Sequence, residues 1–144
     1  MDATESNRSQ ARLQVTSITI GTSQPHDLAH FYAALLGLTV TADEPPVAGD
    51  PTRGGWAQIR PPSPEAGPVL NFEYEQQFIR PTWPSVAGGQ NATQHLDIAV
   101  DDLDVAVQWA VDRGAALAAV QPQEHVRVLF DPDGHPFCLF ERTP

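Results

Sequence analysis

The sequence has few positive charges and a single cysteine. Eight Lys and Arg residues stand against 18 Asp and Glu residues, which gives a formal net charge of −10 at pH 7. A negative field of this size repels phosphate backbones, so we expect no nucleic-acid partner. The one cysteine, Cys138, excludes both an internal disulfide and a cysteine-rich zinc cluster.

Long apolar runs are also missing. No stretch approaches the roughly 18 consecutive apolar residues of a transmembrane helix. The opening MDATESNRSQ is polar and lacks the apolar segment of a signal peptide. We therefore expect a cytoplasmic protein that has no membrane association.

Proline is abundant, with 14 prolines among 144 residues, which is about twice the usual frequency and disfavours long helices. Hydrophobic residues make up 41% of the chain and charged residues 18%, a composition typical of globular proteins. The length suits one domain. We expect a disordered tail over residues 1–12 and a single domain over residues 13–142.

The first half of this domain is predicted to form a strand, a helix and three further strands. Apolar alternation predicts the first strand over residues 13–21. Pro25 suits the first position of a helix and Gly37 suits a left-handed C-terminal cap, so the helix is expected between them. The three strands follow at residues 38–42, 54–60 and 68–75.

The second half repeats this order. A strand is predicted over residues 93–100, a helix runs from the acidic cluster at 101–104 to Gly114, and three strands follow at 115–120, 126–131 and 136–142. Gly114 repeats Gly37, and Leu96 repeats Ile18, at nearly the same offset along the chain. An internal duplication explains this. The predicted fold class is therefore α+β, with two tandem βαβββ modules at about 13–79 and 93–142, joined by a linker over 80–92.

Each module has one helix, so one face of each sheet is covered and the other is left open. The period of two in a strand decides which side chains share the open face. That face is predicted to carry Ser17, Thr19, Asn71, Glu73, His95, Asp97, Cys138 and Phe140, while Trp56 and Gln58 share one face of their own strand. Aromatic rings mixed with imidazole, carboxylate and amide groups suit a small-molecule site better than a dry core.

Three segments carry a resemblance to a known family. They are Phe31-Tyr32 followed by Leu36-Gly37, the segment QHLDIAVDDL at 94–103, and the segment DPDGHPFCLFE at 131–141. In this order they resemble the vicinal oxygen chelate superfamily, in particular its glyoxalase/bleomycin-resistance-like group, over about residues 13–142. The resemblance implies curled mixed sheets that enclose a cleft, usually in a homodimer. It leaves open whether the paired modules come from one chain or from two.

The resemblance also locates a metal site. Enzymes of the superfamily bind a divalent metal at four strand positions, two in each module, through His, Gln and Glu. By position these fall on Ser17, near Asn71 or Glu73, on His95 and on Cys138. Only His95 is a secure ligand, and a metal enzyme generally needs about three. We therefore expect no metal cofactor, no set of metal ligands and no catalytic residue.

Other candidate residues have simpler interpretations. His26 and His30 have the i,i+4 spacing of a two-histidine metal site, but they lie off the apolar face of their helix, so we expect a solvated surface pair. His125 and His135 border turns and are expected to be exposed. Residues 131–134 are expected to form only a turn.

The functional hypothesis is a binding protein that sequesters an aromatic or planar organic compound without metal, as antibiotic-resistance proteins do. The predicted ligand-binding residues are Trp56, Gln58, Glu73, Trp83, His95, Asp97, Cys138 and Phe140. Gly54 and Gly55 would let a ligand or another backbone approach Trp56 closely.

Two alternatives stay open. One is a metal-dependent enzyme, similar to glyoxalases, dioxygenases or thiol transferases, that uses His95 and Glu73 with a ligand lent by the partner chain. The other is a structural or regulatory dimer that binds no ligand. The expected partners are thus a small molecule and a second copy of the chain.

Overall fold

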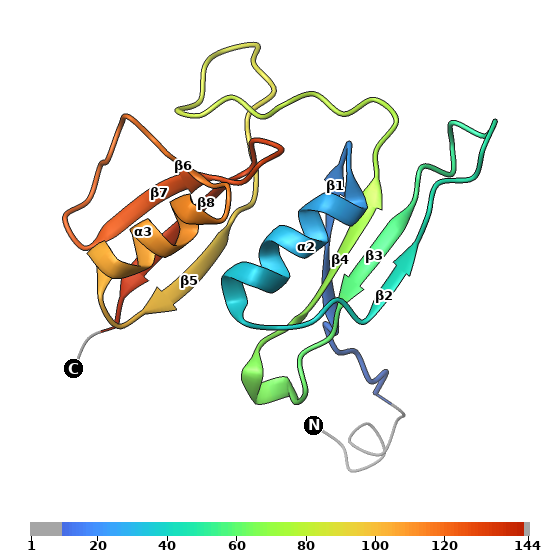
Figure 1. Ribbon diagram of the computed structural model, residues 1–144, viewed down its shortest axis with the longest axis horizontal. Helices are drawn as coiled ribbons and strands as arrows, with labels where there is room; N and C mark the ends of the chain where they lie inside the picture. Colours follow the sequence, from blue (N-terminus) through green and yellow to red (C-terminus); the bar gives the residue numbers. More distant parts are fainter. Residues whose placement is uncertain (1–9, 143–144) are drawn as a thin grey trace, which may run out of the picture.

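The computed structural model describes residues 10–142, so residues 1–9 of the predicted tail lie outside the described residues. It contains two modules side by side (Figure 1). The first module consists of β1 (Ser17–Thr22), α2 (Pro25–Leu36), β2 (Ala42–Glu44), β3 (Trp56–Ile59), the short 3₁₀ helix η1 (Pro64–Ala66) and β4 (Val69–Tyr74). The second consists of β5 (Leu96–Val100), α3 (Leu103–Asp112), β6 (Ala116–Leu117), β7 (Val126–Phe130) and β8 (Pro136–Glu141). Within residues 10–142, no helix is long and apolar enough to cross a membrane.

The two sheets have the same topology, which agrees with the duplication. The strand order is β1-β4-β3-β2 in the first sheet and β5-β8-β7-β6 in the second. In each sheet the first strand of the module pairs in parallel with the last, and the remaining pairs are antiparallel. Thr19 lies opposite Asn71 in the first module, and Asp97 lies opposite Cys138 in the second.

The predicted start of each helix and the predicted end of α2 are confirmed, whereas α3 ends at Asp112, two residues before the expected Gly114. Pro25 is the first residue of α2, and Gly37 ends it in the left-handed conformation with φ 68°. Asp102 caps α3, because its carboxylate accepts a hydrogen bond of 3.1 Å from the backbone N–H of Val105.

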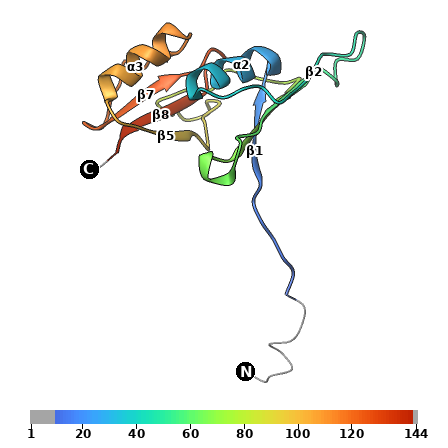
Figure 2. The same ribbon diagram turned by 60° about the horizontal axis from the view of Figure 1, so that its bottom comes forward.

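Several strand boundaries differ from the prediction. Residues 13–16 do not belong to β1, since Leu13 and Val15 are 91% and 89% exposed and the segment leads away from the sheets (Figure 2). The strand expected at 38–42 begins only at Ala42, where pairing with Gln58 of β3 starts. The residue pattern predicts which segment is extended. The position of the partner strand determines which residues of that segment form backbone hydrogen bonds and so count as strand.

Both helices cover the same side of the two sheets (Figure 2). Tyr32 of α2 packs between the modules, with its ring centroid 5.7 Å from that of Phe72 and 6.0 Å from that of Phe137. The two modules therefore share one continuous core on the helix side. Among residues 10–142, no α-helix lies on the opposite face of either sheet, as predicted.

Candidate functional site

The open face of the second sheet brings three predicted site residues together. His95 precedes β5, and its Nε2 lies 3.1 Å from Asp97 Oδ1. Asp97 is paired with Cys138 in the parallel register of β5 and β8. One ligand atom from each of these three residues lies within 4.8 Å of the others.

The thiol of Cys138 is poorly suited to nucleophilic chemistry. Burial raises its pKa, and the negative charge and hydrogen bond of Asp97 raise it further. The thiol is therefore protonated at neutral pH, whereas a nucleophile or a ready metal ligand requires the thiolate.

A cavity of about 250 Å³ lies against this cluster and contains the predicted aromatic residue of the linker. Trp83 forms part of its wall, and the ring of Trp83 meets the ring of Phe130 edge-on at a centroid distance of 6.2 Å. The complete lining is Trp83, Ala92, His95, Pro122, Gln123, Val126, Val128, Pro136 and Cys138. The structure thus places Trp83, His95 and Cys138 around one space.

A second cavity of about 850 Å³ lies between the two modules. Its walls come from residues 18–21 of β1, from residues 90–96 before and within β5, and from the chain that connects the modules, including Phe78 and Ile79. Ala92, His95 and Pro136 line both cavities, so the two spaces adjoin at His95. The connecting chain is therefore a wall of the candidate site as well as a linker, which the strand pattern did not indicate.

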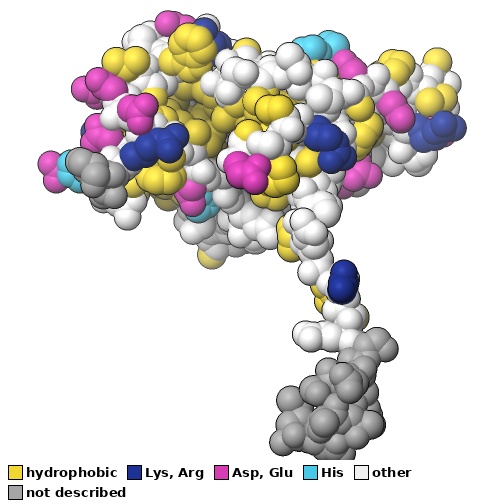
Figure 3. Space-filling view, turned by 90° about the horizontal axis from the view of Figure 1, so that it is seen from below, with side chains coloured by type: hydrophobic (Ala, Val, Ile, Leu, Met, Phe, Trp, Pro, Cys, Tyr) yellow, Lys and Arg dark blue, Asp and Glu magenta, His cyan; other side chains and the backbone are white. Residues whose placement is uncertain are grey.

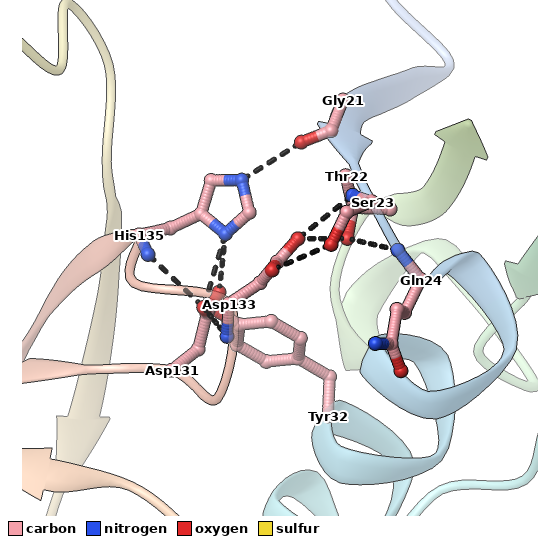
Figure 4. A network of polar contacts seen from close by, with 8 residues as sticks. All are labelled: Gly21, Thr22, Ser23, Gln24, Tyr32, Asp131, Asp133 and His135. Carbon is pink, nitrogen blue, oxygen red and sulfur yellow. Dashed lines mark hydrogen bonds and ion pairs between the residues drawn. The ribbon is translucent and has the colours of Figure 1, made fainter. Parts of the chain in front are cut away.

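Tyr32 and His135 also line the larger cavity, and they belong to a polar network that joins the modules (Figure 4). The buried Asp131 accepts a hydrogen bond of 2.7 Å from Tyr32 Oη and lies 2.9 Å from His135 Nδ1. His135 Nε2 lies 2.8 Å from the carbonyl oxygen of Gly21. The expectation that His135 is exposed is wrong, because its side chain is only 19% exposed.

The same network shifts the pKa values of His135 and Tyr32. Burial alone would lower the pKa of His135, but the hydrogen bond and charge of Asp131, the Gly21 carbonyl and the charge of Asp133 together raise it. The pKa of Tyr32 is raised well above its usual value by burial and then by the charge and hydrogen bond of Asp131. Tyr32 is therefore a neutral donor, and both ring nitrogens of His135 face oxygen acceptors.

The remaining predicted site residues lie elsewhere. Gln58 and Asn71 belong to the open face of the first sheet, where Gln58 Nε2 donates to Asn71 Oδ1 at 3.0 Å. Trp56 and Glu73 are cross-strand partners and line a third cavity of about 450 Å³, which has no residue in common with the other two. Phe140 lies on β8 between Ala99 and Val126, outside these linings.

The two glycines before Trp56 differ in what approaches them. Gly55 is approached by another backbone, as expected, because a Cβ atom there would lie 3.1 Å from the Glu44 carbonyl oxygen. The expectation for Gly54 requires correction. A Cβ atom on Gly54 would lie 2.2 Å from the ring of Tyr74, so the close approach that this glycine permits is already taken by a side chain of the same module. Neither a ligand nor another backbone fills that space.

The duplication relates the residues at the expected metal positions of the two modules to one another. Because Thr19 corresponds to Asp97, its partner Asn71 corresponds to Cys138. The Asn71 amide is already engaged, accepting from Gln58 and donating to Thr19 Oγ1 at 3.4 Å. The first module therefore offers a neutral hydroxyl at Ser17 and an already hydrogen-bonded amide at Asn71, and neither is the imidazole or carboxylate ligand that a catalytic ion such as Zn²⁺ takes.

Comparison with known proteins identifies the fold family. Residues 17–140 match the family described as "Glyoxalase-like domain", whereas a search of curated proteins found no match. Among solved structures, TnmS3, an antibiotic binding protein from Streptomyces, is 23% identical with a TM-score of 0.55, covering 94% of this chain and 100% of that one. A glyoxalase/bleomycin resistance protein from Albidiferax ferrireducens is 21% identical with a TM-score of 0.55, covering 90% and 98%. The trypanothione-dependent glyoxalase I of Leishmania major is 15% identical with a TM-score of 0.62, covering 90% and 87%.

At these identities the solved structures establish the fold alone, and they include both binding proteins and enzymes. The family match spans both modules, from β1 to β8. The chain therefore belongs to the glyoxalase-like domain family of the vicinal oxygen chelate superfamily.

Proposed function

We propose that this protein binds a planar or aromatic organic molecule without a metal, in the two adjoining cavities that meet at His95. The observation that carries the proposal is the position of Trp83, whose ring forms one wall of the smaller cavity beside His95 and Cys138. An indole ring offers a large apolar surface and a stacking partner for a flat ligand. The sequestration of such a ligand requires no Lewis acid.

The size, lining and charge of the site support this type of ligand. The larger cavity, at about 850 Å³, falls in the range of roughly 300–1,000 Å³ that is typical of small-molecule sites. Its wall combines apolar side chains with about as many polar ones, including His95 and Asn91. Acidic side chains are spread over the visible side of the molecule (Figure 3), and the net charge is −10, so a neutral or cationic ligand is favoured over an anion.

One protein of similar fold, TnmS3, is described as an antibiotic binding protein. An antibiotic or a similar natural product is therefore our first choice of ligand class. Sequestration of such a compound would make the protein a resistance determinant.

A titration of intrinsic tryptophan fluorescence against a panel of planar aromatic natural products tests the proposal. We expect at least one compound to quench the emission. Truncation of a ring that stacks on the ligand should cost about 1–3 kcal/mol, or roughly 5- to 150-fold in affinity. Trp83→Ala should show this loss and Trp56→Ala should not, because Trp56 lines a separate cavity. No quenching by any compound, or equal affinities in folded Trp83→Ala and wild-type protein, would contradict the proposal.

A metal-dependent reaction is the second candidate, because His95, Asp97 and Cys138 have ligand atoms within 4.8 Å of one another. Glu73, the other metal residue of that hypothesis, pairs with Trp56 in the first sheet and is not part of this group. Elemental analysis after expression in metal-supplemented medium separates the two candidates. We expect no metal whose retention depends on His95. One Zn, Ni, Mn or Fe per chain that is lost in His95→Ala would favour the enzyme.

A further inference from the structure

A second group of donor atoms lies outside the cleft, where α2 passes β2. His26 and His30 are one turn apart on α2, and their ring centroids are 4.4 Å from each other. Asp43 of β2 reaches both rings with the same oxygen: Oδ2 is 2.5 Å from His26 Nδ1 and 3.5 Å from His30 Nε2. The expected surface pair is exposed, but it has a third member that comes from another element.

These three residues are independent of the ligand site proposed above. None of them lines the cavities around Trp83, His95 or Trp56. The buried face of α2 is formed by other residues, among them Leu28, Phe31 and Tyr32, so both histidines belong to its solvent side. Their side chains are 62% and 53% exposed, and that of Asp43 is 31% exposed.

We propose that His26, His30 and Asp43 form a binding site for a divalent transition metal ion of the borderline class, with Zn²⁺ as the reference ion. Two imidazole nitrogens and one carboxylate oxygen are ligand types that Zn²⁺, Ni²⁺ and Cu²⁺ accept, whereas Mg²⁺ and Ca²⁺ prefer oxygen alone. One ligand atom from each residue already lies within 4.8 Å of the other two. Three protein ligands leave a coordination position for water or for a group from outside the protein.

The distances fit a small ion with little movement. Bonds of about 2.0–2.1 Å in a tetrahedral site put neighbouring ligand atoms about 3.3 Å apart. The pair His30 Nε2 and Asp43 Oδ2 is already near this separation at 3.5 Å, and the pair at His26 must open from 2.5 Å. The opening needs only side-chain rotation, since all three groups face solvent. An ion held here would tie α2 to β2 and stabilise the folded chain by linkage.

Isothermal titration with ZnCl₂ tests the site, with His95→Ala as the parent protein so that the cleft cluster cannot contribute. We expect one Zn²⁺ per chain. His26→Ala, His30→Ala and Asp43→Asn should each weaken binding by about 10- to 100-fold, at least the loss caused by removing an outer-shell partner of a metal. His125→Ala and Asp27→Asn are the matched controls, since they remove an exposed imidazole and a carboxylate of α2 outside the trio, and they should bind as the parent does.

Thermal unfolding provides a second readout. Zn²⁺ at about 100 times its Kd should raise the Tm of the parent by about 5–10 °C, and the three ligand variants should lose this rise while keeping the metal-free Tm within a few degrees. Equal Zn²⁺ affinity in the parent and in His26→Ala and His30→Ala would overturn the proposal, as would the absence of Zn²⁺ binding by the parent. Because the cleft ligand is not present in either measurement, failure here leaves the proposed function unaffected.

Discussion

His135 illustrates how much one side chain contributes to joining the modules. Its two ring nitrogens lie against Asp131 of the second module and the Gly21 carbonyl of the first (Figure 4). Both neighbours are acceptors, so the imidazolium form satisfies them best. The loss of this ring would leave the buried Asp131 carboxylate with Tyr32 as its remaining side-chain donor.

The pKa of His135 is raised in the folded state, so its contribution to stability has a definite dependence on pH. The contribution is complete below the ordinary histidine value of about 6.5 and is lost as the pH rises through the folded-state pKa. We predict that the free energy of unfolding of the wild type falls, relative to that of His135→Gln, which cannot titrate, as the pH rises above about 6.5. Urea unfolding at a series of pH values measures both curves, and parallel curves would refute the prediction.

The neighbouring Asp133 responds in the opposite direction. Burial alone would raise its pKa, but hydrogen bonds from Thr22 and Ser23 and the charge of His135 lower it. The contribution of Asp133 is therefore present above the ordinary aspartate value of about 3.9 and is lost as the pH falls through its lowered pKa. The interface between the modules should thus be most stable from about pH 4 to pH 6.5.

At the scale of elements, α2 belongs to the first module but is held at both ends by the second. Asp133 accepts 2.8 Å hydrogen bonds from both the backbone N–H and the hydroxyl of Ser23, just before the helix begins. At the other end, Trp109 Nε1 of α3 donates to the Leu35 carbonyl at 3.1 Å. These contacts satisfy polar groups at both ends of α2 and fix the helix across the boundary between the modules.

We predict that Asp133→Ala destabilises the protein more than Asp102→Ala does. Asp102 caps α3 within its own module, and removal of such a cap costs about 1 kcal/mol. Asp133 also bonds the buried Thr22, so its removal should cost about 2–3 kcal/mol. Urea unfolding of the two variants at pH 7 gives the comparison, and an equal or smaller loss for Asp133→Ala would count against the role of this turn.

Patterns along the chain predicted the elements better than the contacts between them. The glycine cap at Gly37 and the cap at Asp102 follow from local chemistry, so they could be located in advance. The turn at 131–134 was recognisable only as a turn, because its partners Thr22 and Ser23 are more than 100 residues away in the sequence. The contact between Asp43 and His26 could not be predicted either, since no local pattern relates β2 to α2.

The residues of the candidate site were also predictable only in part. The period of two correctly placed Asp97 and Cys138 on one face, because strand geometry fixes which side chains share a face. It could not place Trp83, which lies in the connecting chain, where no periodicity determines the path. Trp56 was expected beside the same ligand, but it lines a separate cavity of the first module.

At the scale of the whole molecule, both sheets leave their open faces on the side away from the helices (Figure 2). Within residues 10–142 no α-helix covers these faces, and a second copy of the chain could close them as a symmetric dimer. We predict that sedimentation equilibrium at micromolar concentration gives twice the chain mass of 15.6 kDa. A strict monomer would contradict this prediction, and the cleft would then have to bind its ligand from one chain alone.

The central claim, that a flat organic ligand binds beside Trp83, is tested most directly by the three indole N–H signals in a ¹H–¹⁵N NMR spectrum. The chain has three tryptophans, at positions 56, 83 and 109, and Trp→Phe variants assign one signal to each. Titration with the tightest compound of the aromatic panel should shift the Trp83 signal and leave those of Trp56 and Trp109 in place. Of the three tryptophans, Trp83 alone lines one of the two adjoining cavities, the smaller one. A bound compound that leaves the Trp83 signal unmoved, or a panel in which no compound moves it, would contradict the account.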